Sequence, residues 1–211
     1  ELKTPLTVIM TNAELLQSPD YDESSRRQFS ENILTMSRQM RSLVEDLLEL
    51  ARSDNEQSKI TFSKFNFSAL VENALLIFEP IIFEKEITLT SLVENDVHIN
   101  ANAPRLQQVL DILLDNAQKY TAANGWIRVE LARCGRSRCR LAVSNTGSPL
   151  SQDDLKSIFK RFYRADKARV RDGSFGLGLS IAENIVLAHH GRIWAESKNN
   201  INSFYVELQT V

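Results

Sequence analysis

The stretch "FSENILTMSRQMRSLVEDLLEL" (residues 29–50) carries the most regular apolar pattern in the chain. Its apolar residues recur at alternating intervals of four and three. They are Phe29, Ile33, Met36, Met40, Leu43, Leu47 and Leu50. This alternation is typical of a helix that packs along a coiled-coil or bundle seam. The pattern predicts one helix over 24–54.

The residues before this stretch repeat the pattern over a shorter length and predict a second helix over 1–17. The two helices are joined by "SPDYDES" (18–24), a short connection that makes them antiparallel neighbours. Two helices alone cannot cover both apolar seams, so a second copy of the hairpin would complete a four-helix bundle. A helix that lies on the core of its own domain carries a similar pattern, and the pattern alone leaves this alternative open.

The pattern changes after "RSDNEQS" (52–58), where short alternating segments replace the long helical repeat. Strands are expected at 60–67, 86–94, 97–100, 126–134, 139–145, 192–197 and 203–208, and helices at 68–84, 103–120 and 177–190. His189 and His190 precede Gly191, which is typical of a helix end with a glycine C-cap.

These elements predict an α+β protein in two parts. An antiparallel helical hairpin over 1–57 would be half of a dimeric four-helix bundle. An α/β domain over 58–211 would follow, with helices packed on a mixed sheet.

Composition argues against several classes of protein. With 211 residues, 43% of them apolar, the chain can bury a substantial core. A formal net charge of −2 argues against bulk binding to nucleic acid or anionic membranes. The longest apolar run, "ALLIFEPIIF" (74–83), contains Glu79 and Pro80 and is too short to span a bilayer. Cys134 and Cys139 flank a predicted hairpin loop and are expected to be free thiols, because nothing else indicates secretion.

Three clusters of small, amide and basic residues in the second part are candidates for chemistry. The first, "LLDNAQKYT" (113–121), places Asn116 and Lys119 three residues apart on a helix, with Tyr120 a turn beyond Asn116. An amide oxygen can hold Mg²⁺, and an ammonium group can hold phosphate. Polar residues at a helix end are also common, so this cluster alone fits both interpretations.

The other two clusters are turns rich in glycine. In "SNTGSPL" (144–150), Gly147 permits a close turn and Asn145 offers an amide to a base edge, although a plain turn has the same composition. "DGSFGLGLS" (172–180) runs into a helix, where N–H groups and the helix dipole favour phosphate. Between them, "KRFYRADKARVR" (160–171) holds six cations in twelve residues. It is either a solvated face or a lid that closes on a triphosphate.

In this order, the motifs resemble the ATP-binding domain of sensor histidine kinases. "LLDNAQKYT" is similar to the asparagine box of that family, "FKRFYRADKAR" to its phenylalanine box, and "SNTGSPL" and "FGLGLSI" to its two glycine boxes. The opening "ELKTPLT" (1–7) resembles the end of the phosphoacceptor box, in which a histidine stands immediately before the acid. The resemblance spans nearly all of the chain.

The resemblance implies a role for each matching residue. Glu1 would accept a proton from the attacking imidazole, Thr4 would help to dephosphorylate a response regulator, and Asn116 would bind Mg²⁺. The remaining ATP-binding residues would be Lys119, Tyr120, Asn145, Gly147, Leu150, Arg161, Arg164, Gly176, Leu177 and Gly178. The implied cofactors are ATP and Mg²⁺. The implied partners are a second copy, through 1–57, and the receiver domain of a response regulator.

Four positions depart from the family pattern. Ile112 and Asn145 stand where the family usually has asparagine and aspartate, and Pro149 and Ser174 stand where it has glycine. Autophosphorylation would also require the family's histidine directly before Glu1. The family further implies the cytoplasmic portion of a plasma-membrane protein, attached only through a segment upstream of this stretch.

The leading hypothesis is the core of a two-component histidine kinase, which transfers the γ-phosphate of ATP to a histidine and then to a response-regulator aspartate. The departures motivate a second hypothesis, a degenerate nucleotide-binding dimer that acts mainly as a phosphatase of the regulator. A third is an ATP-hydrolysing machine of the gyrase and ninety-kilodalton chaperone superfamily, against which the hairpin and the basic lid argue. A nucleic-acid binder that uses 160–171 fits the net charge least.

Overall fold

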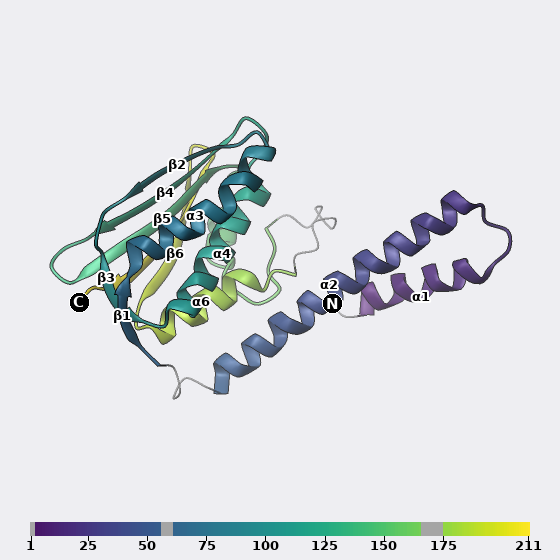
Figure 1. Ribbon diagram of the computed structural model, residues 1–211, viewed down its shortest axis with the longest axis horizontal. Helices are drawn as coiled ribbons and strands as arrows, with labels where there is room; N and C mark the ends of the chain where they lie inside the picture. The colour runs from purple at the N-terminus through teal and green to yellow at the C-terminus, as the bar shows by residue number, and fades with distance from the viewer. Residues whose placement is uncertain (1–2, 56–60, 166–174) are drawn as a thin grey trace.

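The computed structural model describes residues 3–55, 61–165 and 175–211 (Figure 1). Two antiparallel helices, α1 (Lys3–Gln17) and α2 (Glu23–Asn55), form an arm that extends from an α/β domain. Near the turn between them, the rings of Tyr21 and Phe29 meet edge-on with centroids 5.0 Å apart. Further along, Asn32 Nδ2 donates a hydrogen bond to Asn12 Oδ1 at 3.1 Å. The predicted helical hairpin is therefore confirmed.

The α/β domain follows the predicted order of helices and strands. Its elements are β1 (Ser63–Asn66), α3 (Phe67–Glu84), β2 (Thr88–Val93), β3 (His98–Ala101), α4 (Ala103–Tyr120), β4 (Trp126–Arg133), β5 (Arg138–Thr146), α5 (Gln152–Leu155), α6 (Gly178–Ala188), β6 (Arg192–Lys198) and β7 (Ile201–Gln209). Five strands form one sheet in the order β2-β4-β5-β7-β6, in which only the β2–β4 pair is parallel. The helices α3, α4 and α6 lie on one face of this sheet (Figure 1).

Two features of the domain were not predicted. The strands β1 and β3 pair with each other in a separate two-stranded sheet, and the short helix α5 follows β5. The core between helices and sheet is apolar, and α4 contributes to it at helical spacing, from Leu106 to Ala117. Cys134 and Cys139 are free thiols, and burial raises the pKa of Cys139 to about 12.

The arm contacts the α/β domain through α2. Leu43 is 0% exposed and belongs to the same apolar cluster as the domain core, against which Leu47 is also packed. The C-terminal half of α2 lies beside α6 (Figure 1). In the single chain, Leu43 and Leu47 of the predicted seam therefore also pack on the α/β domain. The apolar pattern had left open that the helix lies on the core of its own domain.

The end of α6 differs in detail from the glycine cap expected there. His190 adopts the left-handed conformation, with φ at +56°, whereas Gly191 has an ordinary φ. Glycine is needed at 191 because a Cβ would lie 2.6 Å from the carbonyl oxygen of Glu207. His189 is buried; its Nε2 accepts a hydrogen bond from the backbone N–H of Asn102 at 3.0 Å, and its Nδ1 lies 2.7 Å from Ile185 O. The ring is neutral and ties α6 to the start of α4.

This arrangement predicts a pH dependence of stability. Burial lowers the pKa of His189 from its ordinary value of 6.5. Because the folded state prefers the neutral ring, this stabilisation is present above the unfolded pKa and is lost as the pH falls through the folded one. We expect the melting temperature to drop between about pH 7 and about pH 5, and His189→Gln to reduce that drop. Circular dichroism at both pH values measures it, with the exposed neighbour variant His190→Gln as control; an equal drop in both variants would contradict the assignment.

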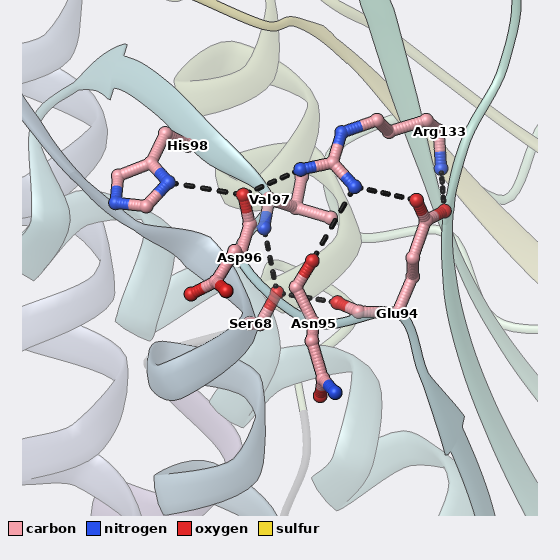
Figure 2. Close-up of polar contacts among 7 residues, drawn as sticks. All are labelled: Ser68, Glu94, Asn95, Asp96, Val97, His98 and Arg133. Atoms are coloured by element: carbon pink, nitrogen blue, oxygen red, sulfur yellow. Dashed lines mark hydrogen bonds and ion pairs between the residues drawn. The ribbon is translucent and has the colours of Figure 1, made fainter.

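An arginine joins two strand ends at one edge of the sheet, as Figure 2 shows. The Arg133 guanidinium lies 2.5 Å from Glu94 Oε1 and donates to the carbonyl of Asp96 at 2.5 Å. The backbone N–H of Arg133 donates to the same Glu94 carboxylate. This backbone hydrogen bond, followed by the one from the guanidinium group, lowers the pKa of Glu94. Ser68 Oγ donates to the Glu94 carbonyl at 2.6 Å, which connects α3 to this cluster. The cluster lies at the opposite end of β4 from Ile127, which pairs with Asn145.

We expect Arg133→Gln to lower the melting temperature by a few degrees, because the shorter amide cannot reach the carboxylate and the carbonyls together. The affinity for any ligand at the Asn145 end of the sheet should stay unchanged. Thermal unfolding combined with ligand titration measures both quantities. A loss of affinity without a loss of stability would show that the cluster has a different role.

Candidate functional site

The last two turns of α4 form one wall of a cavity of about 530 Å³. The apolar face of the helix is buried in the core, and Asn116, Lys119 and Tyr120 line the cavity. Asp115 lines it too, and its Oδ2 lies 2.5 Å from Lys119 Nζ. The wall therefore offers an amide, an ammonium group and a carboxylate within one helical turn.

The end of β5 forms the adjoining part of the cavity. Asn145 is 2% exposed, and its Nδ2 donates a hydrogen bond to the carbonyl of Thr146 at 3.0 Å. A Cβ at Gly147 would lie 3.0 Å from the carbonyl oxygen of Tyr120, so the chain passes close to the end of α4 here. The segment from Ser148 to Leu150 then continues along the cavity.

The N-terminus of α6 opens on the same cavity. It is lined there by Gly176, Leu177 and Gly178. Gly176 has a φ of +71°, and a Cβ at this position would lie only 2.5 Å from the carbonyl oxygen of Tyr163. The side chains of Asn66, Asn102 and Ser151 cap α3, α4 and α5, whereas Leu177 at the start of α6 provides no side-chain cap among the described residues. Such a start presents N–H groups and a partial positive charge, which favour an anion.

Hydrogen bonds hold residues 162–163, at the start of the basic stretch, beside the start of α6. The backbone N–H of Phe162 donates to the carbonyl of Gly176 at 2.9 Å, and the Tyr163 hydroxyl donates to Asp154 Oδ1 at 2.6 Å. Ser151 completes a capping box with Asp154, and the hydrogen bonds from Ser151 and then Tyr163 lower the pKa of that carboxyl. A charged carboxylate thus holds residues 162–163 beside the α6 start.

The structure brings most of the predicted site residues into this one cavity. Those in its lining are Asn116, Lys119, Tyr120, Asn145, Leu150, Arg164, Gly176, Leu177 and Gly178. Of the other predictions within the described residues, Gly147 is outside the lining but adjoins Tyr120 and Asn145, which line it. Arg161 is outside the lining, and Thr4 is exposed on the first turn of α1. Glu1 and Ser174 lie outside the described residues.

Six polar lining residues were not among the predicted site residues: Ser42, Asp115, Ser148, Asp154, Tyr163 and Asn202. Asp115 lies inside the first motif, and its position directly before Asn116 could have indicated that it lines the same site. Asp154 follows a serine three residues earlier, which is the signature of a capping box. Ser42 and Asn202 come from α2 and β7, far along the chain from the motifs, and no local pattern marks them.

A magnesium ion fits the cavity only in the company of a phosphate ligand. The described residues contain no group of three or more His, Cys, Asp and Glu side chains that would hold a metal alone. Mg²⁺ is usually bound by one or two protein oxygens together with substrate phosphates and water. On the α4 wall, the Asn116 amide oxygen and the Asp115 carboxylate are oxygens of this kind, and the start of α6 lines the same cavity.

Comparison with known families places both parts of the chain. Residues 1–56 match the model of the His Kinase A (phospho-acceptor) domain, and residues 101–210 match the family described as histidine kinase-, DNA gyrase B-, and HSP90-like ATPase.

No helix in 3–55, 61–165 or 175–211 has the length and apolarity that crossing a membrane requires.

Related proteins support the same assignment. The chain is 35% identical to the sensor protein DltS of Streptococcus agalactiae over 99% of its own length and 51% of that protein. It is 33% identical to the sensor protein kinase WalK of Staphylococcus epidermidis, covering 93% of the chain and 33% of that protein. The chain therefore spans a third to a half of the length of these relatives.

Solved structures share the fold. Histidine kinase ThkA, in its complex with the response regulator protein TrrA, superposes with a TM-score of 0.79 at 25% identity, over 100% of this chain and 59% of that one. The histidine kinase AdeS of Acinetobacter baumannii has the same fold, with a TM-score of 0.74 at 24% identity, over 99% of this chain and 96% of that one.

The helical hairpin carries the match to the phospho-acceptor domain, and the α/β domain, with its glycine-flanked helix N-terminus opening on the cavity, carries the match to the ATPase family. The chain belongs to the sensor histidine kinases of two-component systems.

Proposed function

We propose that the cavity binds ATP with Mg²⁺ and that the chain is the kinase core of a longer sensor protein. The N–H groups at the start of α6 and the ammonium group of Lys119 would hold the phosphates. Asn116 would contribute an oxygen to Mg²⁺, which neutralises charge on the phosphates when bound. Asn145 and Tyr120 would border the adenine, and Arg164 would approach from the basic stretch.

The acceptor in this proposal is a histidine directly before Glu1. Its imidazole nitrogen would form a bond to the γ-phosphorus, the bond from that phosphorus to the β,γ-bridging oxygen would break, and ADP would leave. The Glu1 carboxylate would take the proton from the other ring nitrogen. A response-regulator aspartate would then receive the phosphoryl group.

Two further observations support a dimeric assembly with a regulator. Leu6, Met10 and Leu48 on the hairpin are each about half exposed, at 45%, 55% and 52%, an apolar surface that a second copy would cover. The structurally similar ThkA is known in complex with a response regulator protein. By family resemblance, this core would lie on the cytoplasmic side of a membrane and be attached through segments upstream of it.

One observation carries the proposal: the segments around Asn116, Asn145 and Leu177 line a single cavity. Calorimetry with a non-hydrolysable ATP analogue and Mg²⁺ tests it, and a dissociation constant on the order of micromolar is expected. Label transfer from γ-labelled ATP to a chain extended by one histidine before Glu1 tests the chemistry. A folded chain that does not bind the analogue would rule the proposal out.

A second candidate is a nucleotide-binding dimer that mainly dephosphorylates its regulator. It is favoured by Ile112 and Asn145, which replace a polar group and a charged group in the cavity, and by Thr4, which is exposed on α1. Binding of the analogue without label transfer in the histidine-extended chain, together with Thr4-dependent dephosphorylation, would select this candidate over the first.

A further inference from the structure

A tight turn between β6 and β7 sets two polar residues opposite each other beside the cavity. Asn199 and Asn200 both have positive φ, at +53° and +60°, as a two-residue hairpin turn of type I′ requires. The turn fixes the register in which Ser197 on β6 pairs with Asn202 on β7. Asn202 in turn pairs with Asn145 on β5, at the end of the sheet that forms the cavity.

These two side chains bond to each other and to the segment 147–150. Ser197 Oγ donates a hydrogen bond to Asn202 Oδ1 at 2.7 Å and accepts one from the backbone N–H of Leu150 at 2.9 Å. Asn202 Nδ2 donates to the carbonyl of Ser148 at 3.0 Å. Asn202 is 6% exposed. The serine and the asparagine thus act together as one link between the sheet and the segment.

The segment that they hold is part of the cavity lining. Ser148, Pro149 and Leu150 all line the cavity. Pro149 has no N–H to donate, so the hydrogen bonds of its neighbours fix the position of the segment. The sequence gives no sign of this, because the pair lies about fifty residues beyond the motif that it supports.

We propose that Ser197 and Asn202 are positioning residues for the nucleotide, which set the segment 147–150 against the ligand. The inference rests on the proposed function, since it concerns the same cavity. Without the pair, the segment must be ordered when the ligand binds, and this costs affinity. The phosphoryl-transfer step involves other residues and is unaffected once the site is saturated.

Calorimetry with a non-hydrolysable ATP analogue tests the pair in the full chain. Ser197→Ala and Asn202→Leu are each expected to raise the dissociation constant roughly 10-fold. Ser197→Thr, which keeps the hydroxyl, should restore wild-type affinity. In the histidine-extended chain, KM for ATP should rise by the same factor as the dissociation constant, while kcat changes less than about 2-fold.

The matched control is Ser203→Ala. Ser203 is the next residue of β7, and its hydroxyl bonds to Ser144 Oγ at 2.8 Å outside the cavity lining. A purely structural role would lower the melting temperature in all of these variants and leave the affinity unchanged. If the wild-type chain binds the analogue and Ser197→Ala and Asn202→Leu bind it with the same affinity as Ser203→Ala, the inference is overturned and the proposed function stands. The same follows if Ser197→Thr does not restore the affinity. Absence of wild-type binding would overturn both.

Discussion

Replacing Asn116 by leucine is expected to lower the rate of histidine phosphorylation at least about 100-fold, with the fold intact. Leucine has the same branched shape as asparagine but offers no oxygen to a metal ion. Asn116 lines the cavity from the outer face of α4 and is not part of the apolar core. Label transfer in the histidine-extended chain measures the rate. Calorimetry with and without Mg²⁺ should show that the variant loses the metal-dependent part of nucleotide binding.

The control for this variant is Asn73→Leu, the same substitution at an exposed position of α3 outside the cavity lining. It should leave both the rate and the metal dependence unchanged. If Asn116→Leu bound the analogue with the same magnesium dependence as the wild type, Asn116 would not be the magnesium ligand. A parallel loss in both variants would indicate a general effect on the fold.

Replacing Leu43 by aspartate is expected to detach the arm from the α/β domain. Leu43 is 0% exposed, and its side chain belongs to the apolar cluster that α2 shares with the domain. Removing a buried leucine costs about 2–5 kcal/mol, and placing a carboxylate there adds a desolvation cost. Small-angle scattering should therefore give a larger radius of gyration. The α/β domain should keep its own thermal transition, because its core is formed by its own sheet and helices.

Leu43→Met is the matched control, since methionine has a similar volume and remains apolar. Its radius of gyration should equal that of the wild type. Because Ser42 lines the cavity beside Leu43, nucleotide affinity measured in both variants tests whether the arm contributes to the site. An unchanged radius for Leu43→Asp would mean that the contact at Leu43 does not hold the arm in place.

The helices and most strands of this protein were predictable because their apolar periods are strong. The helix α4 was expected over 103–120 and has these bounds, since its apolar residues recur at helical spacing and Asn102 caps its start. The strand expected over 60–67 ends at Asn66 in the structure, because Asn66 caps a helix that begins at Phe67; within the described residues it starts at Ser63. The pairing of β1 with β3 was not predictable, because it joins segments that no local pattern relates.

For the candidate site, local composition identified the segments but not all of their partners. Asn116, Asn145 and Gly176 were predicted because they lie in short motifs rich in glycine and amide residues. Such residue types indicate a tight backbone turn or a polar side chain that contacts a ligand. Asp154 was missed because no element was predicted over 151–155, although its capping box with Ser151 is a local signal. Ser197 and Asn202 were missed because their role depends on the register between two strands.

The sequence by itself determined the two-part organisation, the order of helices and strands, and which segments carry chemistry, because periodicity, capping and glycine content act over a few neighbouring residues. Only the tertiary structure decided that these segments surround one cavity, that Leu43 of the arm belongs to the core of the domain, and that the α6 start faces the amide and ammonium groups of α4. These arrangements depend on packing and hydrogen bonds between residues far apart in the chain, which a local pattern does not encode.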